Sequence, residues 1–330
     1  MRTSHVFVLV GLCAAAGCKS ASSPTSTGTG TGSGGTGTGS SGGGKGGWTA
    51  GEDALLSDVN PDGTFENGAP PISGVSLFAI ACRNQGEAWV VGDAGTTIYT
   101  DDGGDTWSTQ TVPTTATLRS VATQDDGPVF LVGDGAFLES DDTGATWQSF
   151  GDGTTSFRSV SAASDGATVL AIASDGGVWS YDGGAIQKTT TLAGAHAVAI
   201  SPDGMLALVV GQQAIWKSSD AGFTWTALDI GQTATFDDIH LDQDGNGVAV
   251  GDAGAVALID PSGTITMTHV GTANLHTVHI GGWGSVGSTG FTAGDGGQVY
   301  ISDDNGWNWH EGPDLGRTVY GIDSIGLGHR

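Results

Sequence analysis

Seven side chains that can bind a ligand or titrate recur along the chain at intervals of 38 to 44 residues. They are Phe78, Arg119, Arg158, His196, Asp237, His276 and Tyr320. Each is the second residue of a short, mostly apolar segment, so we expect all seven to hold one equivalent position in a repeat. A purely structural position would carry one small or apolar residue type, whereas this set mixes two cations, two imidazoles, an anion and two aromatics.

The chemistry of this set favours an anionic or carboxylate-bearing feature of a partner. Residues 48–330 contain five arginines, and two of them, Arg119 and Arg158, fall at this position in adjacent repeats. His196 and His276 would make binding weaken as the pH rises past about 6.5, the ordinary imidazole value. The alternative is that these side chains satisfy one another, with Asp237 pairing to a neighbouring histidine.

The elements that must position these residues are β-strands. Two positions after each of them stands a β-branched residue, at Ile80, Val121, Val160, Val198, Ile239, Val278 and Ile322. A second apolar run ending in Val-Gly-Asp or a variant follows the first six of these segments, as in VVGDAG from Val90. Runs of four to six apolar residues bounded by Gly and Asp are typical of strands.

An eight-residue phrase closes four of the repeats: TDDGGDTW, SDDTGATW, SSDAGFTW and SDDNGWNW. Its Asp can accept hydrogen bonds from its own turn, its Gly can take a positive φ, and its Trp can fold back under the turn. We therefore assign a structural hairpin role to these residues. They are Asp102, Gly104, Trp107, Asp142, Gly144, Trp147, Asp220, Gly222, Trp225, Asp304, Gly306 and Trp309.

The period predicts an all-β, seven-bladed β-propeller of four-stranded antiparallel blades over residues 48–330. Six complete repeats can be counted, and a seventh first strand at 319–322 lies close to the end of the sequence. Trp48 lies 41 residues before Trp89, which is one period. We expect the segment from Trp48 to supply the rest of that blade, so that both termini close the ring and leave no exposed sheet edge.

The phrase resembles the Asp-box, or BNR repeat, of sialidase-type propellers. With VGDAGTTIY ahead of it at 91–99, the repeat looks most like that of the photosystem II assembly and stability factor family. This resemblance implies a non-enzymatic module that assists assembly or binds a protein. That family has an arginine patch on its propeller, which carries over here only as Arg119 and Arg158.

A sialidase-type glycoside hydrolase or a carbohydrate-binding propeller is the alternative function. In the resembled sialidases the chemistry needs an arginine trio, an Arg-Ile-Pro-like motif and a Tyr/Glu nucleophile pair. No Arg-x-Pro occurs in this sequence, and glutamates are few. We therefore expect no catalytic residues and no enzymatic activity.

The first 17 residues resemble a bacterial lipoprotein signal peptide. An apolar run of 11 residues, Val6 to Ala16, precedes Ala-Ala-Gly-Cys, with Cys18 as the expected lipidated residue. A spanning helix needs about 20 residues, so the run is too short to be one. Ala15 stands where Leu is common in such signals, and ordinary secretion with cleavage near Ala16 is the alternative.

The segment 18–47 is expected to be a lipidated cysteine followed by a flexible Gly/Ser/Thr tether. The protein would then be anchored in the bacterial cell envelope, at the outer membrane or cell surface rather than the inner membrane. Cys82 would be the only cysteine of the folded domain, and we expect it in the core.

The formal charge of −25 disfavours nucleic acid and anionic membrane surfaces as ligands. Two stretches, Asp58–Asp62 and Asp242–Asn246, match the opening of a calcium loop. Both lack the glutamate at the twelfth position, where Ala69 and Ala253 stand. We expect no metal, no cofactor, a monomer, and an envelope protein or glycan as partner, with the membrane touched only through the lipid.

Overall fold

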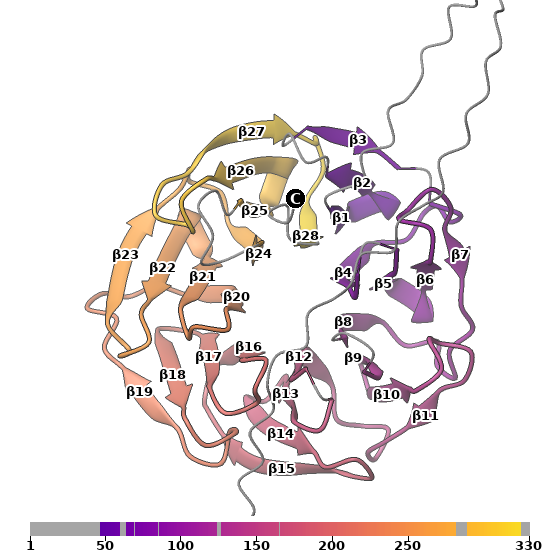
Figure 1. The fold of residues 1–330 in the computed structure, drawn as a ribbon, viewed down its shortest axis with the longest axis horizontal. Coiled ribbons are helices and arrows are strands. Elements are labelled where there is room, and N and C mark those ends of the chain that lie inside the picture. Colours follow the sequence, from indigo (N-terminus) through magenta and orange to yellow (C-terminus); the bar gives the residue numbers. More distant parts are fainter. Residues whose placement is uncertain are drawn as a thin grey trace, which may run out of the picture. The chain divides into compact units, whose positions relative to one another are not determined.

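Short runs of Val, Ile, Leu and Ala between Gly and Asp turns form seven four-stranded antiparallel sheets in the computed structural model. The sheets are arranged in a ring (Figure 1), and a channel runs along its first strands. The structure describes residues 47–59, 64–68, 70–84, 86–123, 127–164, 166–281 and 289–324. The predicted all-β, seven-bladed propeller with four-stranded blades is confirmed. None of the described helices is long and apolar enough to cross a bilayer.

The first strand of each blade lies against the channel. These strands are β4 (Leu77–Cys82), β8 (Leu118–Thr123), β12 (Phe157–Ala162), β16 (Ala195–Ile200), β20 (Phe236–Leu241), β24 (Leu275–Ile280) and β28 (Val319–Ser324). The second strands are β5 (Ala88–Gly92), β9 (Val129–Gly133), β13 (Val169–Ala173), β17 (Ala207–Gly211), β21 (Gly247–Gly251), β25 (Gly290–Gly294) and β1 (Gly47–Gly51).

The two outer strands of each blade complete the sheets. The third strands are β6 (Thr97–Thr100), β10 (Ala136–Ser140), β14 (Gly177–Tyr181), β18 (Ala214–Ser218), β22 (Ala255–Ile259), β26 (Gln298–Ser302) and β2 (Leu56–Val59). The fourth strands are β7 (Ser108–Thr109), β11 (Gln148–Ser149), β15 (Ile186–Thr191), β19 (Thr226–Leu228), β23 (Ile265–His269), β27 (His310–Asp314) and β3 (Phe65–Asn67). Short 3-10 turns join second and third strands at η1 (Glu52–Ala54), η2 (Asp93–Gly95), η3 (Asp252–Gly254) and η4 (Asp295–Gly297).

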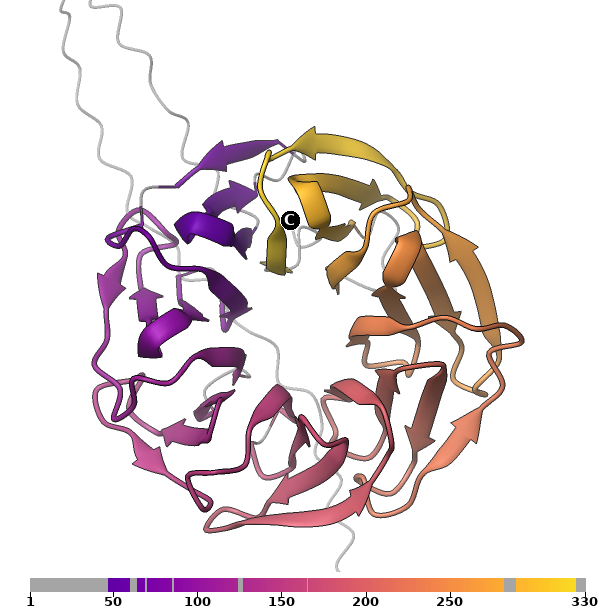
Figure 2. The same ribbon diagram turned by 180° about the vertical axis from the view of Figure 1, so that it is seen from behind.

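One blade combines segments that are far apart in the sequence. Its strand order is β28-β1-β2-β3, with Ile322 of β28 opposite Thr49 of β1 and Ser324 opposite Gly47. The two ends of the ribbon therefore lie side by side, as both views show (Figures 1 and 2). Because β28 pairs with β1, the inner edge of that blade is occupied like those of the others.

The core lies between the blades. All seven second strands are buried along their whole length, because each is covered by sheets on both sides. One of the clusters between blades joins Phe130 and Phe137 of one sheet to Phe157 and Tyr181 of the next. Such packing fixes the angle at which adjacent first strands face the channel.

The four hairpin phrases share the hydrogen bonds to the Asp carboxylate and to the Ser or Thr hydroxyl, and three of them also share the hydrogen bond of the Trp indole. In the second copy, the Asp142 carboxylate accepts from the Thr146 N–H at 2.7 Å and from its hydroxyl at 2.6 Å. The Ser140 hydroxyl accepts from the Gly144 N–H at 2.7 Å, and Gly144 has a φ of 89°. The Trp147 indole donates to the Gly144 carbonyl at 3.1 Å. These contacts account for the whole phrase as a turn.

Candidate functional site

A β-bulge places each of the seven side chains singled out by the sequence. In every first strand the register shifts by one residue, and the extra residue is Phe78, Arg119, Arg158, His196, Asp237, His276 or Tyr320. A bulge bends the strand and re-aims the side chain that it leaves unpaired. The set that the sequence aligned is therefore also one structural position, which we call the mouth ring.

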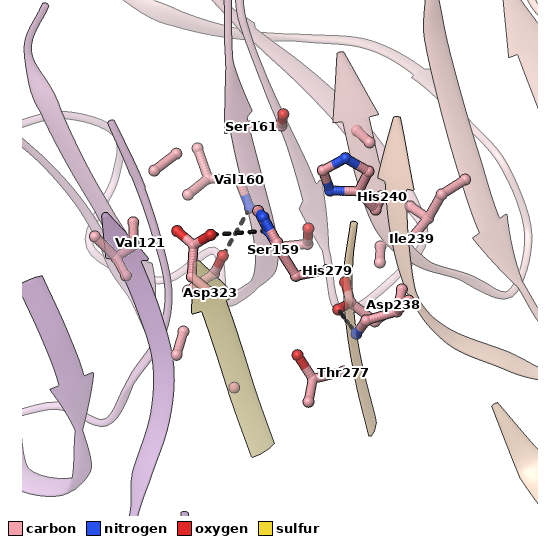
Figure 3. A pocket seen from close by; sticks show the side chains of 18 of the residues that line it. Val121, Ser159, Val160, Ser161, Asp238, Ile239, His240, Thr277, His279 and Asp323 are labelled. Carbon is pink, nitrogen blue, oxygen red and sulfur yellow. Dashed lines mark hydrogen bonds and ion pairs between the residues drawn. The ribbon is translucent and has the colours of Figure 1, made fainter. Parts of the chain in front are cut away.

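All seven mouth-ring residues line one channel of about 840 Å³. Arg119 and Arg158 are exposed, and the other five are half-buried. Figure 3 shows part of the deeper wall of this channel. Side chains from every blade thus converge on a single opening.

Half of the mouth ring is an arc of aromatic and cationic side chains. The rings of Phe78 and Tyr320 lie 5.3 Å apart between centroids, and those of His276 and Tyr320 lie 5.7 Å apart. The guanidinium of Arg119 lies 6.0 Å from the centroid of Phe78. This arc offers flat apolar faces on which a partner's side chain can stack.

The two arginines are not equivalent. Arg119 forms a bidentate pair with Asp134, through Nε at 2.8 Å and Nη2 at 2.9 Å. Asp134 belongs to the Val-Gly-Asp turn of the same blade. The guanidinium of Arg119 is therefore already paired with a carboxylate of its own blade. For Arg158, by contrast, the described part of the chain provides no ion pair. The two arginines that the sequence predicts as ligand anchors therefore differ in their surroundings, and their role in binding stays a prediction.

The acidic member of the mouth ring lies between its two histidines. Oxygens of Asp237 lie 3.4 Å from Nδ1 of His196 and 3.2 Å from Nδ1 of His276. Burial opposes ionisation of Asp237, but its contacts with the two imidazoles outweigh burial and hold the pKa of the carboxyl well below its ordinary value. This part of the ring is the mutual pairing that the sequence left open as an alternative.

His276 contacts a second carboxylate on the turn after β25. Its Nε2 lies 2.8 Å from Asp295. The contact with Asp237 and, against the effect of burial, the contact with Asp295 raise the pKa of His276 above its ordinary 6.5. A raised pKa means that His276 keeps its proton to higher pH than an ordinary imidazole does.

Below the mouth ring, polar side chains join adjacent first strands. Side-chain oxygens accept backbone N–H groups from the next blade, where no strand-to-strand ladder exists. The pairs are Ser120 with Val160, Ser159 with Val198, Asp238 with Val278, Thr277 with Ile322, Ser161 with Ile200 and Asp323 with Cys82, at 2.7 to 3.2 Å. These contacts satisfy backbone donors that the channel would otherwise leave unpaired.

A deeper group of titratable residues was missed by sequence reasoning. His240, His279 and Asp323 lie on three consecutive blades at one level of the channel (Figure 3). The two imidazole rings are 4.8 Å apart, and Nδ1 of His279 lies 2.8 Å from Asp323. Burial, and secondly His279, lower the pKa of His240 to about 3, so this imidazole is neutral at physiological pH.

Cys82 lies at the edge of this group. It is half-buried, packs against an inter-blade cluster and lines the channel, so it is not a fully enclosed core residue. Burial, and secondly Asp323, raise the pKa of its thiol well above the ordinary range. A thiol held in its protonated form is a poor nucleophile and a poor metal ligand.

The structure describes one of the two calcium-like stretches, Asp242–Asn246, completely and the other, Asp58–Asp62, only in part. Asp242 accepts from the backbone and side-chain nitrogens of Asn246 at 2.7 and 2.9 Å, so its carboxylate closes its own turn. Of the other stretch, residues 60–62 lie outside the described residues. Among the residues that the structure describes, no three metal-ligating side chains are grouped to hold an ion.

The comparisons with known proteins agree with the fold. Residues 63–199 match the family described as DUF6242 beta propeller domain, a match that covers less than half of the chain. None of the curated protein sequences is a significant match.

Several solved structures share the architecture. YCF48 bound to D1 peptide is 19% identical with a TM-score of 0.57, covering 72% of this chain and 80% of that one. YCF48 from Cyanidioschyzon merolae is 17% identical with a TM-score of 0.58, covering 74% and 87%. Virginiamycin B lyase from Staphylococcus aureus is 15% identical with a TM-score of 0.62, covering 76% and 92%. At these identities the likeness concerns the fold alone.

Proposed function

We propose that this chain is an envelope-anchored, non-enzymatic propeller that binds a polypeptide partner at the mouth ring. The observation that carries the proposal is the convergence of seven chemically different bulge residues on one channel opening. Packing alone gives no reason for such variety at a repeated position. The similar fold of YCF48, a protein solved with a bound peptide, supports a scaffold role.

The contacts of the ring suggest how the partner is held. Arg158 supplies the guanidinium for a carboxylate of the partner, because Arg119 is paired with Asp134. The arc of Phe78 and Tyr320 supplies a surface for an apolar or aromatic side chain. Arg119 then serves mainly to position the Phe78 ring from above.

The described channel does not favour a glycosidase. Arg119 and Arg158 are the arginines of the mouth ring, and the first is already paired with a carboxylate of its own blade. A third arginine, Arg83, also lines the channel, but it follows the other end of β4 and donates to the Thr123 hydroxyl and the Gly127 carbonyl. The mouth ring itself therefore holds two of the described channel arginines, fewer than the sialidase-like trio. The lyase neighbour shares the fold at 15% identity and assigns no reaction to this chain.

Anchoring completes the proposal. Cys18 carries the lipid, and residues 19–46 form the tether that holds the propeller away from the membrane surface, since Gly47 already belongs to β1. A single acyl chain gives only marginal membrane binding, whereas two or three hold a protein stably. The envelope fraction is accordingly the place to look for the partner.

The test is a pull-down from the envelope fraction with residues 48–330 as bait, comparing Arg158→Gln with Arg119→Gln. We expect Arg158→Gln to lose most of the captured partner, and Arg119→Gln to retain more because its charge is already neutralised. Thermal melting of both variants controls for folding. Equal partner recovery by wild type and a folded Arg158→Gln variant would refute the mouth ring as the site.

A further inference from the structure

A second cavity, of about 360 Å³, lies at the outer rim of the propeller. It is formed by the end of β23 in one blade and by the β26–β27 hairpin of the next. Ser302, the first residue of that hairpin phrase, pairs with Gly290 of β25, which in turn pairs with Ile280 of β24. Ile280 and His276 lie at opposite ends of β24. The hairpin side of the cavity thus lies toward the opposite end of the strands from the mouth ring, while its other side, Thr268 to Gly271, adjoins the η3 turn, where the Val270 N–H donates to the Gly254 carbonyl.

The other three copies of the hairpin phrase show which residues of this cavity the turn itself requires. The cavity's hairpin is the fourth copy of the phrase, and Trp307 stands where the other copies have Asp105, Ala145 and Phe223. Glu311 stands where they have Thr109, Ser149 and Ala227. The turn forms without either residue in three other blades, and both line the cavity. Folding of the hairpin therefore does not explain them.

The cavity wall is mainly aromatic, with one carboxylate, Glu311, and one exposed imidazole, His269. Tyr300, Trp307 and Trp309 border it, and Trp307 is 58% exposed, which is unusual for a large apolar side chain. Glu311 is an exposed carboxylate, and the lining contains neither lysine nor arginine. Within the described residues, Glu311 takes part in no ion pair.

Two polar side chains of the lining are already used within the hairpin. The Trp309 indole donates to the Gly306 carbonyl at 2.9 Å. The Asn308 side chain donates to Asp304 at 2.6 Å. The aromatic faces and the carboxylate of Glu311 remain, and these are the groups that attract an organic cation.

We propose that this cavity binds an alkylammonium group, the chemistry shared by a choline headgroup and a lysine side chain. Indole faces attract such cations through their quadrupole, and Glu311 adds a full negative charge beside them. The chain's formal charge of −25 raises the local concentration of cations around it. The volume lies at the small end of ligand pockets, which suits a headgroup better than a large molecule.

The test measures binding of choline chloride to the full chain carrying Cys18→Ser, by titration calorimetry and ligand-observed NMR. We expect saturable binding with a Kd on the order of 1 mM, since a few cation contacts of this kind give weak affinity. Trp307→Ala should weaken it at least about tenfold and Glu311→Gln several-fold. Phe223→Ala is the matched control at the same repeat position, exposed at 76%, and should leave the affinity unchanged.

Two further ligands distinguish a lipid headgroup from a protein side chain as the source of the ammonium group. Phosphatidylcholine vesicles that retain the unlipidated chain through Trp307 would identify a lipid headgroup, whereas binding of Nα-acetyl-lysine methylamide alone would identify a protein side chain. Either supports the proposal. The neutral isostere 3,3-dimethylbutan-1-ol should bind at least about tenfold more weakly than choline. Equal binding of the isostere, unchanged affinity in Trp307→Ala, or saturable binding of monosaccharides but of no ammonium ligand would overturn it.

Discussion

Asp237 and Asp238 are neighbours on β20, yet the fold shifts their carboxyl pKa values in opposite directions, which gives a sharp stability test. Asp238 lies on the channel wall and accepts the Val278 N–H at 2.9 Å (Figure 3). Burial raises its pKa from 3.8 to about 6, in spite of this hydrogen bond. An acid whose pKa is raised by folding stabilises the fold while it is protonated. This contribution is present below its unfolded pKa and is lost as the pH rises through about 6.

The magnitude follows from the shift. Each pKa unit corresponds to 1.36 kcal/mol, so ionised Asp238 costs at most about 3 kcal/mol at neutral pH. The side chain is half-buried and faces a channel wide enough for water, so we expect about 1 to 2 kcal/mol. Asp238→Asn keeps an oxygen for the Val278 N–H and cannot ionise. Relative to wild type, its free energy of unfolding should therefore rise by about that amount between about pH 4 and pH 7.

Urea unfolding followed by tryptophan fluorescence, between about pH 4 and pH 8, measures this difference. Asp237→Asn is the matched control, because the depressed pKa of Asp237 makes its ionised form stabilising above its unfolded pKa. That variant should lose stability at neutral pH and approach wild type as the pH falls. If Asp238→Asn shows the same pH dependence as Asp237→Asn, the assignment of the two environments is wrong.

Three other changes test the fold and the anchor. Ser140→Ala leaves the buried Gly144 N–H without its acceptor and should cost about 1 to 3 kcal/mol, seen as a lower urea midpoint at unchanged slope. Ending the chain at Gly316 removes β28 with its buried Val319 and Ile322, and should cause aggregation or a large fall in Tm. A soluble, cooperatively melting product would show that β28 is not needed to complete its blade. Cys18→Ser should release the protein from membranes, and undiminished sedimentation would contradict lipidation.

Much of the architecture was predictable because each blade repeats the same pattern of short strands and turns. The period of about 40 residues fixed the blade number, and the position of the mouth ring followed from aligning the first strands. The sequence could not show that this position is a bulge, because a register shift depends on the partner strand. It is nevertheless the bulge that explains why the aligned residues face the channel opening.

The interactions within the site were less predictable, because they join separate repeats or the two strands of one hairpin. Asp134 is the last residue of one of the Val-Gly-Asp runs and had no predicted partner, yet the β8–β9 hairpin brings it to Arg119. The group of His240, His279 and Asp323 occupies the third position after the mouth-ring residue, where the other four blades have Ala or Ser. That contrast was present in the alignment. Its meaning required knowing that three consecutive blades meet at one level.

The most direct test of the account is photo-crosslinking from the mouth ring in intact cells. A benzophenone amino acid in place of Phe78 should crosslink to one polypeptide of the envelope, and added Arg158→Gln should abolish that product. The same group in place of Phe223, at the end of the blades away from the mouth ring and 76% exposed, should not yield it. Crosslinking of the same polypeptide from Phe223 but not from Phe78 would place the binding surface on the other face and contradict the proposed function.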